Sequence, residues 1–138
     1  MAEPLRAIDA NVLLRYLLND VPEQAEKARR LIDSEQRIGL TVIALAEVAW
    51  KLAGPPYKRR RSEVAVKFID LLARENVVGI GFDKDEAQFA LTACTSETKA
   101  AGLGDALIAA CARSAGIEEI YSFDQGFSLA GLITISPP

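Results

Sequence analysis

The sequence predicts a single three-layer α/β domain in which helices cover both faces of a mainly parallel sheet. Short apolar runs of strand length alternate with longer amphipathic stretches, the pattern expected for right-handed β–α–β units. The chain has 138 residues, the size of one domain, and no internal repeat, low-complexity segment or linker divides residues 1–138. Half of the residues are hydrophobic and a quarter are charged, as in an ordinary globular protein.

The first half of the chain contains two expected strands and three expected helices. The opening apolar run ends in Asp9, and a helix follows at once. Pro22 signals the start of the second helix, and Thr41 is placed to cap the third. Because the third helix is apolar almost all round, we expect it to be buried. In chain order the elements are the strand 5–8, the helices 11–18 and 22–34, the strand 37–40 and the helix 42–53.

The second half continues the alternation of helices and strands. Asp83 is placed to cap one helix, and Gly116 ends another. In chain order the elements are the helix 62–74, the strand 77–82, the helix 84–94, a polar loop 96–101, the helix 106–115, the strand 119–123, a turn 124–126 and an edge strand 132–135.

The composition excludes several kinds of chemistry. The chain contains no histidine, so carboxylates, a metal, lysine or tyrosine must carry any catalysis near neutral pH. The net charge of −3 argues against nucleic-acid binding by overall charge, although it is compatible with a local basic patch. Cys94 and Cys111 are far apart in sequence, and we expect both to be buried thiols in a reducing cytosol.

No targeting or membrane segment is expected. The start of the chain lacks the basic segment and long apolar run of a signal peptide. No apolar stretch approaches the ~20 residues that a membrane helix needs. The expected localisation is therefore cytoplasmic, without a membrane partner.

Asp9 and Glu47 are the first two candidate functional acids. Asp9 closes a strand and precedes a helix, where a carboxylate serves equally well as a helix N-cap. Glu47 is placed to pair with Lys51 four residues later, if that helix face is exposed. However, the helix carries no other charge, and a carboxylate on a buried helix is costly without a compensating cation. The sequence therefore favours function for Glu47 and leaves both interpretations of Asp9 open.

Asp105 and Asp124 complete a set of four acids. Taken singly, Asp105 is explained as a helix cap and Asp124 as part of an Asx turn with Gly126. All four acids, however, are expected at strand ends or helix starts that share one edge of the sheet. Converging carboxylates repel one another unless a divalent cation binds, and hard oxygen ligands favour Mg²⁺ or Mn²⁺ over zinc. Such a site can activate a water for attack on a phosphodiester.

Four segments resemble the PIN-domain ribonucleases in the order and spacing of that family. They are IDANVLLRYL (8–17), AEVAW (46–50), GDALIAA (104–110) and YSFDQGF (121–127). The resemblance is greatest to the VapC-type toxins of bacterial toxin–antitoxin pairs and covers nearly the whole chain. It implies an α/β/α sandwich with a five-stranded parallel sheet, and Mg²⁺- or Mn²⁺-dependent cleavage of single-stranded or looped RNA. It also implies a small inhibitory antitoxin and a homodimer.

The resemblance also assigns roles by position. The acidic quartet would be Asp9, Glu47, Asp105 and Asp124, and hydrogen bonds from Asn11 and Ser122 would support it. Two positions depart from the family pattern. Ala10 stands where the family usually has threonine, and Gly126 stands where many members carry a further acid. We therefore expect a second metal ion to be held weakly, or only together with substrate.

A basic run is the candidate contact to RNA phosphates. It consists of Lys58, Arg59, Arg60 and Arg61, next to Tyr57. Arg15, one helical turn from Asp9 and Asn11, is a further candidate. A solvated surface loop explains such a run at least as well. Affinity for RNA that falls steeply with salt would favour the phosphate contact.

Three other functions remain open from the sequence. A receiver-type phosphoacceptor domain would also hold Mg²⁺, but Asp83 is a poor fit to its phosphorylated aspartate, and no lysine follows the fifth strand. A catalytically silent PIN-like module would bind a partner without metal. A structure-specific DNA nuclease is the narrowest alternative, because this short chain lacks the insertions that such enzymes use.

Overall fold

The computed structural model describes residues 4–96, 98–99, 101–124 and 126–138. Its helices are α1 (Ala10–Leu18), α2 (Pro22–Ile32), α3 (Val42–Ala53), α4 (Arg61–Leu72), α5 (Lys84–Thr92), α6 (Leu103–Ser114) and the 3₁₀ helix η1 (Gly126–Ala130). Its strands are β1 (Arg6–Ala7), β2 (Ile38–Thr41), β3 (Val77–Ile80), β4 (Glu119–Tyr121) and β5 (Ile133–Ile135). Parts of the expected loop 96–101 and turn 124–126 lie outside the described residues, as does the start 1–3.

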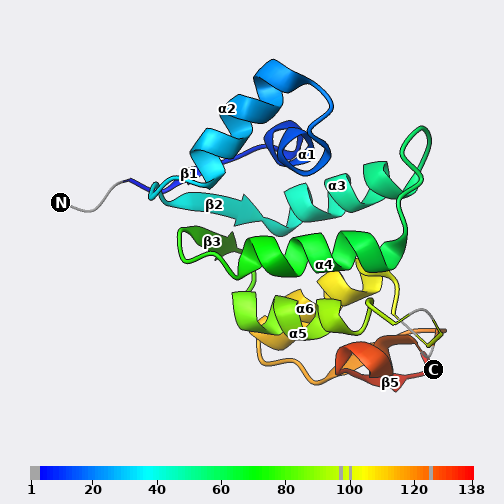
Figure 1. Ribbon diagram of the computed structural model, residues 1–138. Coiled ribbons are helices and arrows are strands. Elements are labelled where there is room, and N and C mark those ends of the chain that lie inside the picture. Colours follow the sequence, from blue (N-terminus) through cyan, green and yellow to red (C-terminus); the bar gives the residue numbers. More distant parts are fainter. Residues whose placement is uncertain (1–3, 97, 100, 125) are drawn as a thin grey trace.

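The first three strands form one parallel sheet in the order β1–β2–β3. Gly39, at the centre of β2, lets the neighbouring strands approach, because a side chain there would lie 3.3 Å from Ile80 and 3.6 Å from the Ala7 Cα. The strand β2 leads directly into α3, whose first N–H groups are capped by Thr41 (Figure 1). Thr41 Oγ1 accepts a hydrogen bond from the Ala44 N–H at 3.1 Å, as the sequence predicts.

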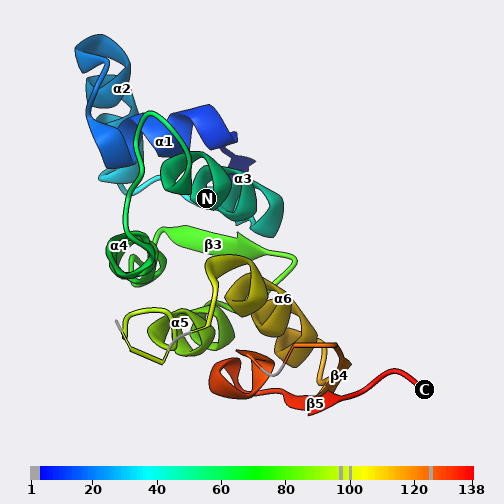
Figure 2. The same cartoon turned by 90° about the vertical axis from the view of Figure 1, so that its right-hand side faces the viewer.

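The last two strands form a separate parallel sheet. Figures 1 and 2 show β4 and β5 on the far side of α5 and α6 from the three-stranded sheet. The α/β class and the parallel pairing are confirmed, but the expectation of a single five-stranded sheet is wrong. The strand β1 has only two residues and β4 only three. Such short strands offer few backbone groups for pairing, so strand pairing alone does not determine their positions.

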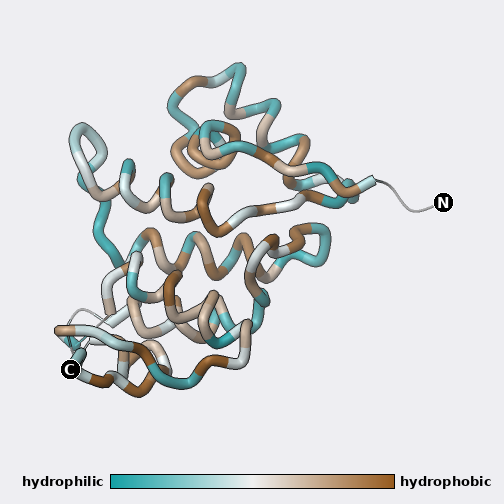
Figure 3. The backbone as a smooth tube through the Cα atoms, turned by 180° about the vertical axis from the view of Figure 1, so that it is seen from behind, coloured by the Kyte–Doolittle hydropathy of each residue, from teal (hydrophilic) through white to brown (hydrophobic). Residues whose placement is uncertain are grey.

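Helices pack around the three-stranded sheet. The helices α1, α2 and α4 are neighbours, because Arg74, just after α4, contacts both Tyr16 of α1 and Asp33 at the end of α2. The helix α5 packs on α4 and on α6 (Figures 1 and 2). Hydrophobic and hydrophilic stretches alternate along the helices, and α2 is largely hydrophilic (Figure 3). The inward-facing side chains form one core that includes Phe68, Leu13 and Leu45, each fully buried. Burial of each such side chain contributes ~1.5–3 kcal/mol to stability.

The helix α3 is not buried all round, contrary to the expectation from its composition. Leu45 and Val48 are fully buried, whereas Ile43 is 76% and Trp50 83% exposed. Glu47 lies on the same exposed face as these two residues, because they are three and four positions away from it. The sequence argument that little exposed surface was left for a Glu47–Lys51 pair is therefore wrong.

The helix α6 begins three residues before its expected start. Gly102 is the N-cap residue, and Asp105 lies within the first turn instead of capping the helix. A carboxylate at this place interacts favourably with the helix dipole. The helix α4 likewise begins at Arg61, and η1 was not predicted. Among the described residues, no helix is long and apolar enough to cross a membrane.

The two cysteines differ in their surroundings. Cys94 is buried, as expected, and Cys111 is only partly buried. Burial raises the pKa of the Cys94 thiol to about 11, so this group stays protonated at neutral pH. The Cys94 thiol also donates to the Gly102 carbonyl, at 3.6 Å, next to the start of α6. Cys94 is therefore part of the packing behind Asp105 and is not a reactive nucleophile.

Candidate functional site

Asp9 lies between β1 and α1 and caps the helix. Its Oδ1 accepts a hydrogen bond from the Val12 N–H at 3.0 Å. This bond engages one carboxylate oxygen, and the side chain remains exposed. Asp9 and Asn11 also line a hollow of about 340 Å³ between α1 and α2. Capping and ligand binding are therefore compatible roles for this carboxylate, because capping uses only one of its two oxygens.

Glu47 lies on the exposed face of α3, and Lys51 connects it to the start of α1. The Nζ of Lys51 lies 3.8 Å from Glu47 Oε1 and 3.5 Å from Asn11 Oδ1. Lys51 thus links the two helices that carry Asn11 and Glu47. Because the Glu47 and Lys51 side chains are 53% and 39% exposed, water screens the ion pair, and it contributes only ~0–0.5 kcal/mol. So weak a pair leaves the Glu47 carboxylate free to take another cation.

Asp105, in the first turn of α6, and Asp124, after β4, come together although they belong to different parts of the fold. A methyl group built on Gly126 would lie 3.7 Å from Asp105 Oδ2 and 3.5 Å from Asp124 Oδ1, so both carboxylates border one small space. Burial, and after it the charge of Asp124, raises the pKa of Asp105 above its ordinary value of 3.8. The two groups therefore repel each other when no cation lies between them.

Ser122 and Gly126 hold Asp124 in position. The Asp124 N–H donates to Ser122 Oγ at 2.9 Å, and the Gly126 N–H donates to Asp124 Oδ1 at 3.0 Å. The second bond is the Asx turn that the sequence predicts. Ser122 is itself anchored, since its N–H donates to the Ile135 carbonyl at 3.0 Å. These bonds aim the Asp124 side chain from the end of β4 toward the start of α6.

The four acids do not form one compact cluster. Among the described residues, no group of three or more acids or cysteines is arranged to hold a metal ion. Asp105 and Asp124 form one part of the candidate site. In the other part, Lys51 connects Glu47 to Asn11, and Asn11 borders the same hollow as Asp9. The helices α3 and α6 pack together, and a hollow of about 310 Å³ between them is lined by the residues next to two of the acids, Ala46 and Gly104.

The donor atoms of the site fit a hard divalent cation. They are carboxylate oxygens and the Asn11 amide oxygen, which Mg²⁺ and Mn²⁺ prefer, and the chain has no histidine to favour zinc. The pKa of Asp105 is raised mainly by its burial and then by the charge of Asp124, and a cation bound between the two carboxylates would offset that repulsion. Lys51 is the neighbour that the sequence interpretation left out of the site, although its i, i+4 spacing from Glu47 signals the contact.

The candidate RNA-binding residues differ in how far they are already engaged. Arg15 Nη1 lies 2.8 Å from both carboxylate oxygens of Asp20. Asp20, and after it Tyr57, raises the pKa of the Arg15 guanidinium. Arg60 contacts Glu63 at 2.9 Å, whereas Arg61 donates to the carbonyl groups of residues 94 and 96. The exposed residues Lys58 and Arg59 leave their charges facing solvent.

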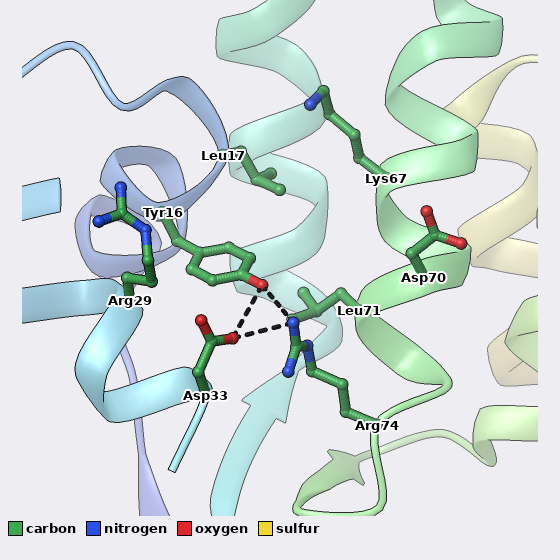
Figure 4. Close-up of a pocket in the computed structure, with 8 residues that line it drawn as sticks. All are labelled: Tyr16, Leu17, Arg29, Asp33, Lys67, Asp70, Leu71 and Arg74. Carbon is green, nitrogen blue, oxygen red and sulfur yellow. Dashed lines mark hydrogen bonds and ion pairs between the residues drawn. The ribbon is translucent and has the colours of Figure 1, made fainter. Parts of the chain in front are cut away.

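A second charged hollow lies between three helices, and none of the four candidate acids lines it. It has a volume of about 370 Å³ and lies between α1, α2 and α4 (Figure 4). Arg74 donates to the Tyr16 hydroxyl at 2.8 Å and pairs with Asp33 at 2.9 Å. Burial is the main cause of the raised pKa of Tyr16. Because Asp33 already neutralises Arg74, this cluster serves as a structural link.

Asp83 also has a structural role. Its Oδ1 accepts hydrogen bonds from the Asp85 and Glu86 N–H groups at 2.8 and 3.2 Å, as a helix cap does. This arrangement argues against the receiver-type alternative, because the carboxylate is turned into the helix start and engaged there.

Comparison with known proteins yields one family. A family model described as "PIN domain" matches residues 7–131. This range includes all four acids and both of their polar neighbours, Asn11 and Ser122. No curated protein and no solved structure gives a significant match.

Proposed function

The chain belongs to the PIN-domain family, and on this premise we propose that it is a Mg²⁺- or Mn²⁺-dependent endoribonuclease. PIN domains are typically nucleases that use divalent metal ions, so the family supports a phosphodiester hydrolase in general terms. The observation that carries the proposal for this chain is the meeting of Asp105 and Asp124 beside Gly126. Two acids distant in sequence share one space there, at a cost in repulsion that a cation would relieve.

The four acids have distinct parts in the proposed mechanism. Asp105 and Asp124 hold the cation from α6 and from the end of β4, while Glu47 and Asp9 extend the site toward α1. When bound, the cation supplies an activated water and neutralises charge that develops on the scissile phosphate. Because the ligands act as carboxylates, the raised pKa of Asp105 makes metal affinity increase with pH.

Polar neighbours orient the acids. Ser122 and the Gly126 N–H fix the Asp124 side chain, and Val12 fixes one oxygen of Asp9. Lys51 keeps Glu47 and Asn11 near each other before a cation arrives. The exposed cations Lys58 and Arg59 are available for phosphates of the substrate, and Arg15, Arg60 and Arg61 contribute positive charge while they hold local structure.

The biological role that we propose is that of a cytoplasmic toxin of a type II toxin–antitoxin pair. The support is the likeness of the four acidic segments to VapC-type sequences. A small antitoxin protein would inhibit the site, and the toxin would form a homodimer. A small open reading frame immediately upstream, encoding a DNA-binding N-terminus, would support this role, and its absence from the neighbourhood of the gene would count against it.

Incubation with total RNA tests the enzymatic proposal. The protein with Mn²⁺ should cleave RNA, and a chelator should abolish cleavage. Asp9→Asn and Asp105→Asn should each abolish cleavage with the fold intact, as judged by circular dichroism. Asp70→Asn is the matched control, since Asp70 is an exposed acid on α4 outside the site. Cleavage that persists in Asp9→Asn and Asp105→Asn, or in the chelator, would contradict the proposal.

A catalytically silent PIN-like module is the competing function. The separation of the four acids into two parts and the Lys51–Glu47 contact are the observations that favour it. Metal titration by calorimetry separates the two functions. A silent module would bind neither Mg²⁺ nor Mn²⁺, with or without RNA.

A further inference from the structure

Trp50 is an exposed aromatic side chain next to the acidic site. Its side chain is 83% exposed, although an indole ordinarily gains from burial. Trp50 lies three residues after Glu47, so the two side chains are neighbours on the same face of α3. Neither core packing nor the proposed metal site accounts for an indole held in this place.

Two hollows flank the Trp50 side chain. One has a volume of about 460 Å³ and is bordered by Lys51, Pro55 and Tyr57. The other, of about 310 Å³, is the hollow between α3 and α6, bordered by Arg61, Leu103 and Gly104. Gly104 directly precedes Asp105 in α6, and Ala46, which also lines this second hollow, directly precedes Glu47 in α3. The Trp50 side chain thus borders both hollows, and the second hollow lies next to the residues that precede Glu47 and Asp105 in sequence.

The charged residues that border these hollows are cationic. Lys51 borders the first and Arg61 the second, and no acid lines either among the described residues. Arg61 donates to the carbonyl oxygens of Cys94 and Ser96, at 3.2 and 2.8 Å. Those partners carry no net charge, so the positive charge of Arg61 is not cancelled. Lys51, in contrast, is paired with Glu47 at 3.8 Å. The surface therefore combines a flat aromatic face with the positive charge of Arg61, which complements a nucleobase and its phosphate.

We propose that Trp50 is a stacking platform for an unpaired base of single-stranded RNA, placed beside the phosphodiester that the acids would cleave. This inference rests on the proposed function and defines its substrate as unpaired RNA at the point of contact. A base within a duplex has no free face to offer, so duplex RNA is excluded. Every base can stack because each has a flat π face. Trp50 would therefore select unpaired over paired RNA and position the strand relative to the acids, without selecting a particular base.

A second copy of the chain is a poorer occupant of this surface. In a two-fold dimer whose axis passes through Trp50, the patch faces its own copy. Arg61 of one protomer would then lie near the partner subunit's Arg61, and the like charges would oppose the contact. An RNA strand has the charge opposite to that of Arg61 and is attracted to it.

Intrinsic fluorescence gives a direct test, because Trp50 is the only tryptophan of the chain. Short single-stranded 2′-O-methyl oligoribonucleotides of one base composition are added in EDTA, so that neither metal nor cleavage contributes. Stacking should quench the Trp50 emission in a saturable way, whereas the same oligonucleotide in a duplex should not. Emission unchanged by the single strand would overturn the proposal.

Variants measured by fluorescence anisotropy of a labelled oligoribonucleotide sharpen the test. Trp50→Ala should weaken binding by about tenfold or more, and Trp50→Phe should retain most of the affinity. Ile43→Ala is the matched control, since Ile43 is 76% exposed on the same helix face and aliphatic. It should bind as the wild type does. Equal loss in Ile43→Ala and Trp50→Ala would show a general apolar contact and refute stacking.

Two further outcomes separate this inference from its premise. Quenching without RNA cleavage in Mn²⁺ would leave the platform standing and reject the nuclease. Cleavage with no quenching would reject the platform alone. Sedimentation of the RNA-free protein tests whether a second copy of the chain occupies the surface. If the wild type is a dimer, Trp50→Ala is a monomer and the RNA affinity of the two is equal, the surface belongs to a second copy and the proposal is overturned.

Discussion

The carboxyl groups of Asp105 and Asp124 face the same space beside Gly126. Asp105 comes from the first turn of α6, and Asp124 from the turn that follows β4, where Ser122 and Gly126 hold it. Burial, and after it the charge of Asp124, raises the pKa of Asp105. This pair is the strongest structural reason to place a cation at this end of the molecule.

The raised pKa of Asp105 predicts a pH-dependent stability difference. Since the folded state binds this proton more tightly than the unfolded state, Asp105 contributes stability below pH 3.8 that is lost as the pH rises through its folded pKa. Asp105→Asn has no such titration. In EDTA, the free energy of unfolding of the wild type should therefore fall relative to that of Asp105→Asn as the pH rises above 3.8. Urea titrations across this range measure the difference, and a difference independent of pH would contradict the assignment.

Gly126→Asp should strengthen metal binding and weaken the metal-free fold. A side chain on Gly126 points into the space between Asp105 and Asp124, so a third carboxylate would add both repulsion and a ligand. The melting temperature should fall in EDTA and recover in Mn²⁺. Gly126→Ala is the control, because its methyl group would make only ordinary contacts of 3.5–3.7 Å. If the aspartate and alanine variants respond equally to Mn²⁺, the space between the acids is not a metal site.

The local roles of several residues could be predicted from the sequence. Thr41, Asp83 and Asp9 act as helix caps, and Asp124 forms its Asx turn with Gly126. Each of these depends on a side chain and a backbone N–H two or three residues away. Such local hydrogen bonds leave a clear sequence signal.

The arrangement of the two sheets could not be predicted in the same way. The strand β1 pairs with β2 and β4 pairs with β5, and strands of two or three residues carry no sequence pattern that specifies a neighbour. The exposed face of α3 was missed because the apolar residues Ile43 and Trp50 look like core residues in sequence. Hydrophobicity alone does not predict burial at a single position, because apolar atoms also make up much of the surface of a folded protein.

Lys51→Met should increase the affinity for Mn²⁺ severalfold. The ammonium group lies 3.8 Å from the Glu47 carboxylate and competes with a cation there, although exposure makes the competition weak. Methionine keeps the length of the side chain and removes its charge. Calorimetric titration of both proteins measures the change. Unchanged or weaker affinity in Lys51→Met would place Glu47 outside the metal site.

The two large aromatic residues Phe68 and Trp50 should differ sharply in their effect on stability. Phe68 is fully buried in the core, so Phe68→Ala should cost ~3–5 kcal/mol. Trp50→Ala should change the free energy of unfolding by no more than ~0.5 kcal/mol, because the indole is mostly in water. Chemical denaturation measures both, and a large loss in Trp50→Ala would show that the indole supports the fold.

Calorimetric titration of Mn²⁺ into the wild type, Asp105→Asn, Asp124→Asn and the control Asp70→Asn tests the central claim most directly. Saturable binding is predicted for the wild type and for Asp70→Asn, with binding lost or greatly weakened in both site variants. Wild-type affinity in Asp105→Asn and Asp124→Asn, or no binding by any of the four proteins, would contradict a metal site at this pair of acids.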